Sequence, residues 1–250
     1  MAAAVKLQRH IGRRRAARFL VEGPNLVEAA LRRGLVSEVF ATEAALDRFG
    51  ALLADAPVQL VTERAAKSLS DTVTPVGLVA VCRVPEVSLD EVLAAAPRLI
   101  AVPVQISEPG NAGTLIRAAD AMGADAVVLA GNSVDPYNSK CLRASAGSIF
   151  SVPVISEPDE AATVTRLQAA GLQVLATTID GEADLDHIDL TPPTAWLFGP
   201  EAHGLPTELA AAADHRVHIP MPGHSESLNI ASAASICLYQ SARAHRSASD

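Results

Sequence analysis

The sequence predicts an α/β protein on the basis of three observations. Short runs rich in Val and Ile alternate with Ala-rich stretches of helical periodicity along the 250-residue chain. Hydrophobic residues make up 49% of the chain and aromatic residues only 3%, which indicates an aliphatic core. Residues 98–105 form a nearly continuous apolar run, as expected for a parallel strand that is buried on both faces.

Residues 1–84 are expected to form a small α/β/α domain, whose length lies within the usual domain range. Gly34 stands where the first predicted helix would take its C-cap. In chain order, the pattern predicts helix 25–33, strand 36–41, helix 43–54, strand 58–61, helix 63–69 and strand 76–84. Residues 85–97 are bounded by prolines and contain a short acidic amphipathic piece, and we interpret them as a linker.

Residues 98–250 are expected to form a second domain with a parallel sheet covered on both faces, because strands and helices alternate. The predicted elements are strand 98–105, helix 111–122, strand 126–130, helix 138–146, strand 152–155, helix 158–170, strands 172–177 and 194–198, helix 206–212, strand 215–219 and helix 228–245.

The charge distribution bears on whether the protein binds nucleic acid. The net charge of −8 has the wrong sign for indiscriminate nucleic-acid binding. Residues 1–21, however, contain several cations and no acid, so they could hold phosphates locally or form a solvated terminus. The candidate RNA contacts in this stretch are Arg9, Arg13, Arg14, Arg15 and Arg18.

The chain has the features of a reduced, cytoplasmic protein. No apolar run approaches the roughly 18 residues of a membrane helix, and the start of the chain lacks the pattern of a secretory signal. Cys82, Cys141 and Cys237 lie far apart, which disfavours a disulfide framework or a zinc site. The spacing of the histidines between 203 and 224 matches no standard metal motif, so we expect no metal.

Three segments rich in Gly, Pro and polar residues follow predicted strands, and ligands of parallel sheets bind at the carboxyl ends of strands. The first, residues 108–117, carries Asn111 and Arg117 on a helix start that could hold an anion. By itself this segment favours an ordinary capped helix with a surface arginine. It lacks the G-x-G-x-x-G pattern, which disfavours an NAD-dependent enzyme.

In the second segment, residues 196–206, Gly199 permits close approach of the backbone to a ligand, and Glu201 lies just past the strand end. In the third, residues 218–235, Ser227 and Asn229 place short polar side chains at the start of a helix rich in small residues. A tight loop and a close-packed capped helix are the structural alternatives. Arg143 is a candidate phosphate or ribose contact, or simply part of a helix C-terminus.

Together these segments resemble the SpoU (TrmH-type) branch of the SPOUT RNA methyltransferases. The resemblance rests on Asn111 and Arg117, on residues 198–201 (Phe-Gly-Pro-Glu) with 204–205 (Gly-Leu), and on residues 219–221 (Ile-Pro-Met) with 227–229 (Ser-Leu-Asn). It covers the whole chain, because residues 1–84, with 19–27 (Phe-Leu-Val-Glu-Gly-Pro-Asn-Leu-Val), resemble the L30e-like substrate-binding domain of many members.

The resemblance implies methylation of a ribose 2′-hydroxyl in RNA by S-adenosylmethionine, in a SPOUT domain with a deep trefoil knot that acts as a homodimer. It implies catalytic roles for Arg117, Asn111, Glu201, Ser227 and Asn229. It also implies cofactor contacts, largely through backbone groups, for Gly199, Ile219 and Leu228, with Thr177 and Met221 as further candidates.

The L30e-like domain and the short C-terminal tail favour rRNA, and 23S rRNA in particular, as the substrate. A tRNA ribose methyltransferase is the nearest alternative. A non-catalytic RNA-binding or ribosome assembly factor is the alternative of another class, and the intact motif residues argue against it.

Overall fold

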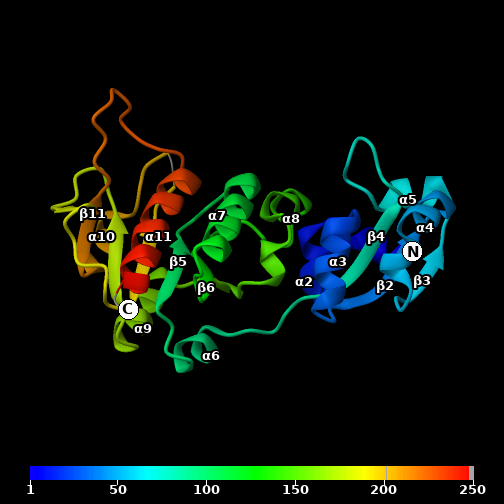
Figure 1. Cartoon of the computed structure of the whole chain (residues 1–250), viewed down its shortest axis with the longest axis horizontal. Helices are drawn as coiled ribbons and strands as arrows, with labels where there is room; N and C mark the ends of the chain where they lie inside the picture. Colours follow the sequence, from blue (N-terminus) through cyan, green and yellow to red (C-terminus); the bar gives the residue numbers. More distant parts are fainter. Residues whose placement is uncertain (201, 248–250) are drawn as a thin grey trace.

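The computed structural model describes residues 1–200 and 202–247, which contain two separate β-sheets (Figure 1). The first sheet has four strands in the order β1-β4-β2-β3, of which only β2 and β3 run parallel to each other. The elements of this part are α1 (Ala2–Val5), η1 (Lys6–Gln8), α2 (His10–Ala16), β1 (Arg18–Glu22), α3 (Pro24–Arg32), β2 (Val36–Ala41), α4 (Glu43–Phe49), η2 (Gly50–Leu53), β3 (Val58–Leu60), α5 (Glu63–Leu69) and β4 (Leu78–Arg83).

Helix caps and a glycine turn determine where several of these elements begin. Thr42 and Thr62 cap α4 and α5, since each hydroxyl accepts a hydrogen bond from the backbone N–H three residues later. β4 is one of the two interior strands and is buried along almost its whole length. It begins two residues later than predicted, because Gly77 has a φ of +72° and lies against Thr42. β1 and the short helices before it were not predicted.

The second sheet has seven strands, all parallel, in the order β7-β6-β5-β10-β8-β11-β9, which confirms the predicted parallel α/β architecture. Its elements are α6 (Leu89–Ala94), β5 (Leu99–Pro103), α7 (Pro109–Ala121), β6 (Ala126–Ala130), α8 (Ser139–Ser145), η3 (Ser148–Phe150), β7 (Val154–Glu157), α9 (Glu160–Ala169), β8 (Gln173–Thr177), β9 (Ala183–Asp184), β10 (Thr194–Phe198), α10 (Thr207–Ala212), β11 (His215–His218) and α11 (Ile230–Ser247).

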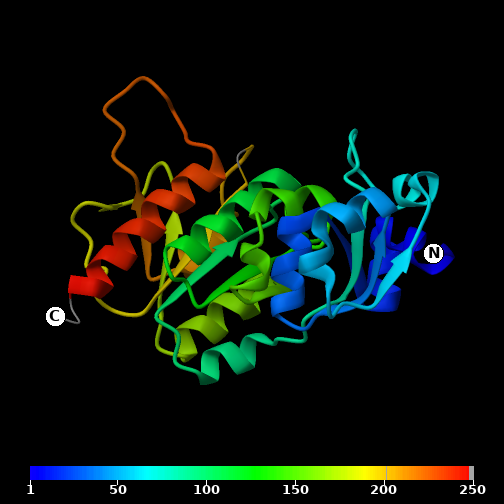
Figure 2. The same cartoon turned by 45° about the vertical axis from the view of Figure 1, so that its right-hand side comes forward.

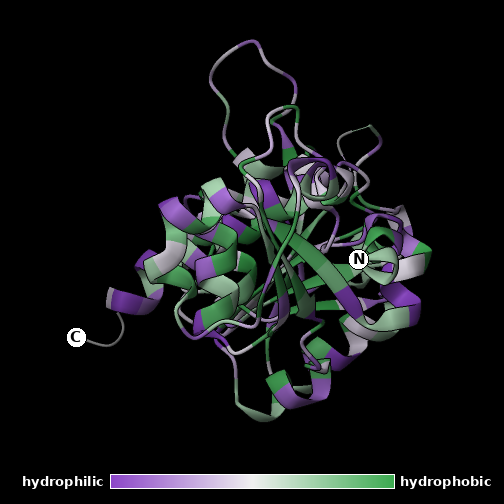
Figure 3. Ribbon diagram, turned by 90° about the vertical axis from the view of Figure 1, so that its right-hand side faces the viewer, coloured by the Kyte–Doolittle hydropathy of each residue, from purple (hydrophilic) through white to green (hydrophobic). Residues whose placement is uncertain are grey.

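Both faces of this sheet are covered, as predicted. Successive residues of β10 alternate between two cores: Trp196 joins the core under α7, α8 and α11, whereas Leu197 joins the core under α6, α9 and α10. Figure 3 shows the resulting arrangement, with hydrophobic strands inside and helices whose outward faces are hydrophilic. Among the described residues, no helix combines the length and apolar character that crossing a membrane requires.

The segment interpreted as a linker also contributes to the core. Its amphipathic piece forms α6, where Ser88 and Glu91 make a capping box. Leu89 and Val92 are buried against the second sheet, which places α6 among the helices that cover that sheet.

The two halves of the chain are in direct contact. α8 lies between α7 on one side and the helices of the first half on the other (Figures 1 and 2). One hydrophobic cluster runs through both halves, with Phe19 and Leu26 from the first and Leu142 and Phe150 from the second. Two long loops, around residues 70–77 and 219–229, project to the same side of the molecule (Figures 1 and 2).

Candidate active site

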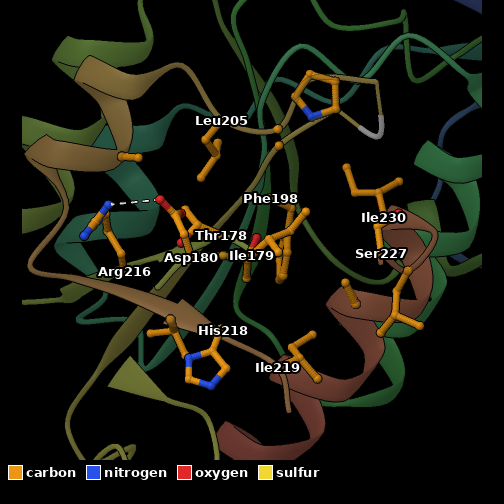
Figure 4. A pocket seen from close by; sticks show the side chains of 18 of the residues that line it. Thr178, Ile179, Asp180, Phe198, Leu205, Arg216, His218, Ile219, Ser227 and Ile230 are labelled. Carbon is orange, nitrogen blue, oxygen red and sulfur yellow. Dashed lines mark ion pairs between the residues drawn. The ribbon is translucent and has the colours of Figure 1, made fainter. Parts of the chain in front are cut away.

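A cavity of about 630 Å³ opens where β8, β10 and β11 end. The loops that follow these strands, together with the start of α11, form its walls (Figure 4). Phe198, Leu205 and Ile219 supply apolar surface, and Asp180 and Glu226 supply acidic groups. The position agrees with the general rule that parallel sheets bind ligands at the carboxyl ends of their strands.

All five residues predicted to contact a cofactor line this cavity. They come from three separate stretches of sequence: Thr177 from β8, Gly199 after β10, and Ile219, Met221 and Leu228 from the loop between β11 and α11. The fold therefore brings together residues that the sequence analysis had selected one motif at a time.

Gly199 is required by a close approach of the backbone. A Cβ atom at this position would lie 2.3 Å from the N atom of Leu205 and 2.5 Å from the carbonyl carbon of Gly204. The turn is closed by a hydrogen bond of 2.8 Å from the Gly204 N–H to the Pro200 carbonyl. No larger residue fits without moving backbone, so this wall of the cavity consists largely of main chain.

Two adjacent threonines differ in what their hydroxyls can do. The Thr177 hydroxyl donates to the Leu197 carbonyl at 2.9 Å and so ties β8 to β10. The Thr178 hydroxyl is buried beside the cavity and has no hydrogen-bond partner within residues 1–200 and 202–247. A buried polar group of this kind is stabilised by any partner that reaches it.

The loop after β8 was not selected from the sequence, although it also follows a strand end. Arg216 of β11 holds this loop: its Nε lies 2.9 Å from Glu182 Oε2 and its Nη1 3.7 Å from Asp180 Oδ2 (Figure 4). A hydrogen bond from the Arg216 backbone N–H, helped by the guanidinium charge, lowers the pKa of the Glu182 carboxyl. The residues Asp-Gly-Glu at 180–182 were the signal that could have identified it.

Two of the predicted catalytic residues meet although they are far apart in sequence. The Asn229 side-chain amide donates to the Asn111 Oδ1 atom at 3.1 Å, joining the start of α11 to the start of α7. The Asn229 Oδ1 atom in turn accepts the Ala231 N–H at 2.9 Å. Ser227 lines the cavity two residues before Asn229.

Arg117 lies apart from the cavity of its own chain. It is exposed on α7, and the cavity lining does not include it. Within the described part of the chain it makes no ion pair or side-chain hydrogen bond, so its guanidinium is available to another molecule. Glu201, the remaining predicted catalytic residue, lies outside the described residues.

The predicted RNA contacts fall into two groups. Arg9, Arg14, Arg15, Arg18 and Arg143 are exposed. Two of these lie near acids, at 3.9 Å in the pair Arg18–Glu38 and 4.0 Å in the pair Arg143–Asp71. Arg13 is different, because it is only 7% exposed and pairs with Asp135, so it does not present its charge to a ligand. The described residues contain no group of three side chains placed to bind a metal ion.

The fold and cavity define an α/β protein that binds a ligand at the carboxyl edge of a parallel sheet, with a smaller mixed-sheet unit before it. The sequence profile of the SpoU rRNA Methylase family matches residues 98–239, and that of the MRM3-like substrate binding domain matches residues 2–80. The chain belongs to the SpoU rRNA methylase family, which confirms the resemblance that its motifs indicated.

Individual relatives extend over nearly the whole chain. The 23S rRNA (guanosine(2553)-2'-O)-methyltransferase RlmP of Bacillus subtilis is 36% identical over 224 residues, covering 88% of this chain and 87% of the relative. A crystal structure of an RNA 2'-O ribose methyltransferase is similar with a TM-score of 0.84 at 35% identity, covering 98% of this chain and 95% of the other. The SpoU methyltransferase AviRb from Streptomyces viridochromogenes, solved in complex with AdoMet, gives a TM-score of 0.86 at 31% identity, with coverage of 98% and 97%.

Proposed function

We propose that this protein transfers a methyl group from S-adenosylmethionine to a ribose 2′-hydroxyl of 23S rRNA, in the cytoplasm. The observation that carries the proposal is the match, over most of both chains, to a relative that methylates a 2′-oxygen of 23S rRNA. The meeting of two of the three motif segments, 196–206 and 218–235, at one cavity supports it independently.

The cavity suits adenosylmethionine in size and chemistry. Its volume of about 630 Å³ lies within the usual range of small-molecule sites. Apolar walls accommodate an adenine ring, the main-chain wall at Gly199 offers hydrogen-bonding groups, and Asp180 and Glu226 suit a ligand with cationic groups. The partnerless Thr178 hydroxyl fits a polar ligand as well. When bound, the cofactor supplies a methyl group activated by a sulfonium.

The chain's own part in the reaction is chiefly to orient the ribose. A guanidinium stays protonated in proteins, so Arg117 serves as a donor to the ribose or an adjacent phosphate rather than as a simple base. The Asn229–Asn111 hydrogen bond fixes the start of α7, the helix that carries Arg117. Ser227 and Glu201 complete the proposed catalytic set. Holding the hydroxyl in line with the methyl group accounts for much of the expected rate enhancement.

A homodimer explains why Arg117 lies outside the cavity of its own chain. We propose that each active site takes Arg117 from the partner subunit and that the subunits pack through α11. Ile236 and Tyr239 support this arrangement, because both are large, lie on one side of α11 and are 38% and 49% exposed. Sedimentation of the wild type and an Ile236→Lys variant tests it, since only the wild type should sediment as a dimer.

The two domains have separate proposed roles. We propose that residues 1–84 form an L30e-like RNA-binding domain, that 85–97 connect it to the catalytic domain of 98–250, and that the exposed arginines at 9, 14, 15, 18 and 143 contact RNA phosphates. We also propose that the C-terminal part forms a deep trefoil knot. In support, the loop 219–229 leads from β11 to α11, which covers the face of the sheet opposite α10.

Methyl transfer from labelled adenosylmethionine tests the function. Unmodified 23S rRNA, 16S rRNA and bulk tRNA are offered separately to the wild type, to Arg117→Ala and to Arg98→Ala. Arg98 is the control, because it is an exposed arginine directly before β5, at the amino ends of the strands of the same sheet. We expect label on 23S rRNA with the wild type and Arg98→Ala, and loss of label with Arg117→Ala.

Other outcomes correct the proposal in defined ways. Label on tRNA alone would change the substrate and keep the chemistry. Full transfer by Arg117→Ala would remove that residue from the mechanism. Absence of adenosylmethionine binding, measured by calorimetry, would favour a non-catalytic RNA-binding factor.

A further inference from the structure

Arg13 lies within the basic N-terminal stretch and yet is buried between the two halves of the chain. Its Nε donates to Asp135 Oδ2 at 2.7 Å, and its Nη2 lies 2.6 Å from the same oxygen. Its Nη1 donates to the carbonyls of Leu7 and Gln8, each at 3.0 Å. The guanidinium therefore joins η1 of the first half to the loop before α8 of the second.

Further contacts surround this ion pair on both sides. Phe19 packs on Tyr137 with ring centroids 4.4 Å apart. Arg33 donates from Nε to the Phe150 carbonyl at 2.5 Å. Asp71, in the loop before β4, accepts a hydrogen bond from the Ser139 hydroxyl. Polar pairs at several points around an apolar centre fix the relative orientation of two surfaces more tightly than apolar packing alone.

The segment that receives these contacts, residues 131–151, is joined closely to the catalytic helix α7. The Val134 N–H donates to the Ile106 carbonyl at 2.7 Å, and the Ile106 N–H donates to the Ser133 hydroxyl at 3.1 Å. α8 lies directly on α7, because a Cβ at Gly113 would fall 2.3 Å from the Cys141 carbonyl oxygen. Gly113 is on the same helix as Asn111 and Arg117.

We propose that Arg13 and Asp135 are positioning residues that hold the N-terminal unit in one fixed orientation relative to Arg117 and so select the nucleotide to be methylated. The distance between the RNA-binding surface of the N-terminal unit and Arg117 is then constant. The ribose that lies at this distance from the bound part of the RNA is the one that is methylated. The TM-scores above 0.8 over nearly the whole chain support the same placement of both units in relatives. The proposal rests on the RNA methyltransferase activity proposed above.

The orientation itself is measured by the distance between two spin labels. Arg64→Cys in α5 and Ala162→Cys in α9 provide exposed label sites, one in each half, whereas the three native cysteines are buried. Labelled protein is diluted with unlabelled protein, so that only distances within one chain are recorded. We expect one narrow distance distribution for the otherwise wild-type chain, and broad distributions when Arg13→Gln or Asp135→Asn is added.

Selectivity is measured on 23S rRNA by mapping the methylated nucleotide and separating KM from kcat. Arg13→Gln and Asp135→Asn should lower kcat/KM by about 10- to 100-fold, mainly through kcat, because displacement of a substrate by about 1 Å from the reactive alignment has effects of this order. They should also spread the label to neighbouring riboses. The dissociation constant for adenosylmethionine should stay unchanged, which reports that the catalytic domain is folded. Arg48→Gln, an exposed arginine in the same unit as Arg13, is the control and should behave as wild type.

A broad distance distribution in the wild type would overturn the proposal. So would variants that keep the narrow distribution, or that lose it and still methylate a single nucleotide with the wild-type kcat. If the wild type methylates no RNA, the proposed function fails, and the distance measurement still decides whether the two units are held in one orientation.

Discussion

Gly113 offers a quantitative test of how α7 and α8 pack. In Gly113→Ala the new methyl would lie 2.3 Å from the Cys141 carbonyl oxygen and 2.7 Å from the Ala144 Cβ, so the helices must separate by about 1 Å to reach ordinary contact. Overpacking costs up to about 3 kcal/mol, and the better helix propensity of alanine returns about 1 kcal/mol. The net loss is about 2 kcal/mol. Gly110→Ala, on the same helix, meets Glu108 Oε1 at 3.5 Å, so it should gain about 0.5–1 kcal/mol.

Calorimetric melting of the two variants measures this difference. For a chain of this size about 1 kcal/mol corresponds to about 2–4 °C, so Gly113→Ala should melt about 4–8 °C below wild type and Gly110→Ala at or slightly above it. Displacement of α7 should also lower methyl transfer by Gly113→Ala at temperatures where it is fully folded. A Gly113→Ala variant that melts at or above the temperature of Gly110→Ala would refute the close contact between the helices.

Three further predictions concern single contacts. Ser241→Ala should lower the free energy of unfolding by about 1–3 kcal/mol, because the buried Trp196 indole N–H loses the acceptor that lies 2.9 Å away. Urea titration followed by tryptophan fluorescence measures the change, and an unchanged midpoint would contradict the prediction. Burial raises the pKa of the Cys141 thiol to about 12, so a thiol reagent near neutral pH should label it only after unfolding, and rapid native labelling would be the contrary result. A hydrogen bond from the Lys140 ammonium lowers the pKa of the Glu108 carboxyl from its ordinary 4.5. The stabilisation that the ion pair provides is therefore complete above pH 4.5 and is lost as the pH falls through the lowered pKa. Wild type and Glu108→Gln should converge in stability in acid, and a difference that stays constant with pH would argue against the ion pair.

Much of the fold could be predicted because its strands carry strong patterns. Strands 126–130 and 194–198 begin and end at the predicted residues, since their apolar runs lie between Asp125 and Gly131 and between Pro193 and Gly199. Helix 63–69 also begins and ends as predicted, and the Thr62 cap marks its start. β9 consists of two residues, Ala183 and Asp184, and depends on its pairing with β11, which no local pattern reveals. α6 resembled part of a linker because its two buried residues, Leu89 and Val92, find their partner surface only in the assembled sheet.

The residues of the candidate site also fall into those that local sequence predicts and those that only the tertiary fold reveals. Gly199 could be selected because a glycine-rich turn has a local signature. Ser227 was selected as a helix cap and does line the cavity, but α11 begins at Ile230, and Asn229 is the residue whose Oδ1 accepts the Ala231 N–H. The contact of Asn111 with Asn229 could not be predicted, because it depends on where α7 and α11 lie in the finished fold. Arg13 shows the opposite error: a run of arginines indicates nucleic acid, but burial and the contact with Asp135 give this one member a different role.

The position of β10 between β5 and β8 has a consequence for how the molecule is assembled. Both neighbours precede β10 in the chain, so until it is inserted β5 and β8 each present an apolar strand with unpaired backbone groups on the side that β10 will occupy. Open edges of this kind pair readily with other chains. Fragments that stop before residue 194 should therefore aggregate. Insertion of β10 therefore covers these open edges and at the same time brings Phe198 and Gly199 to the wall of the cavity.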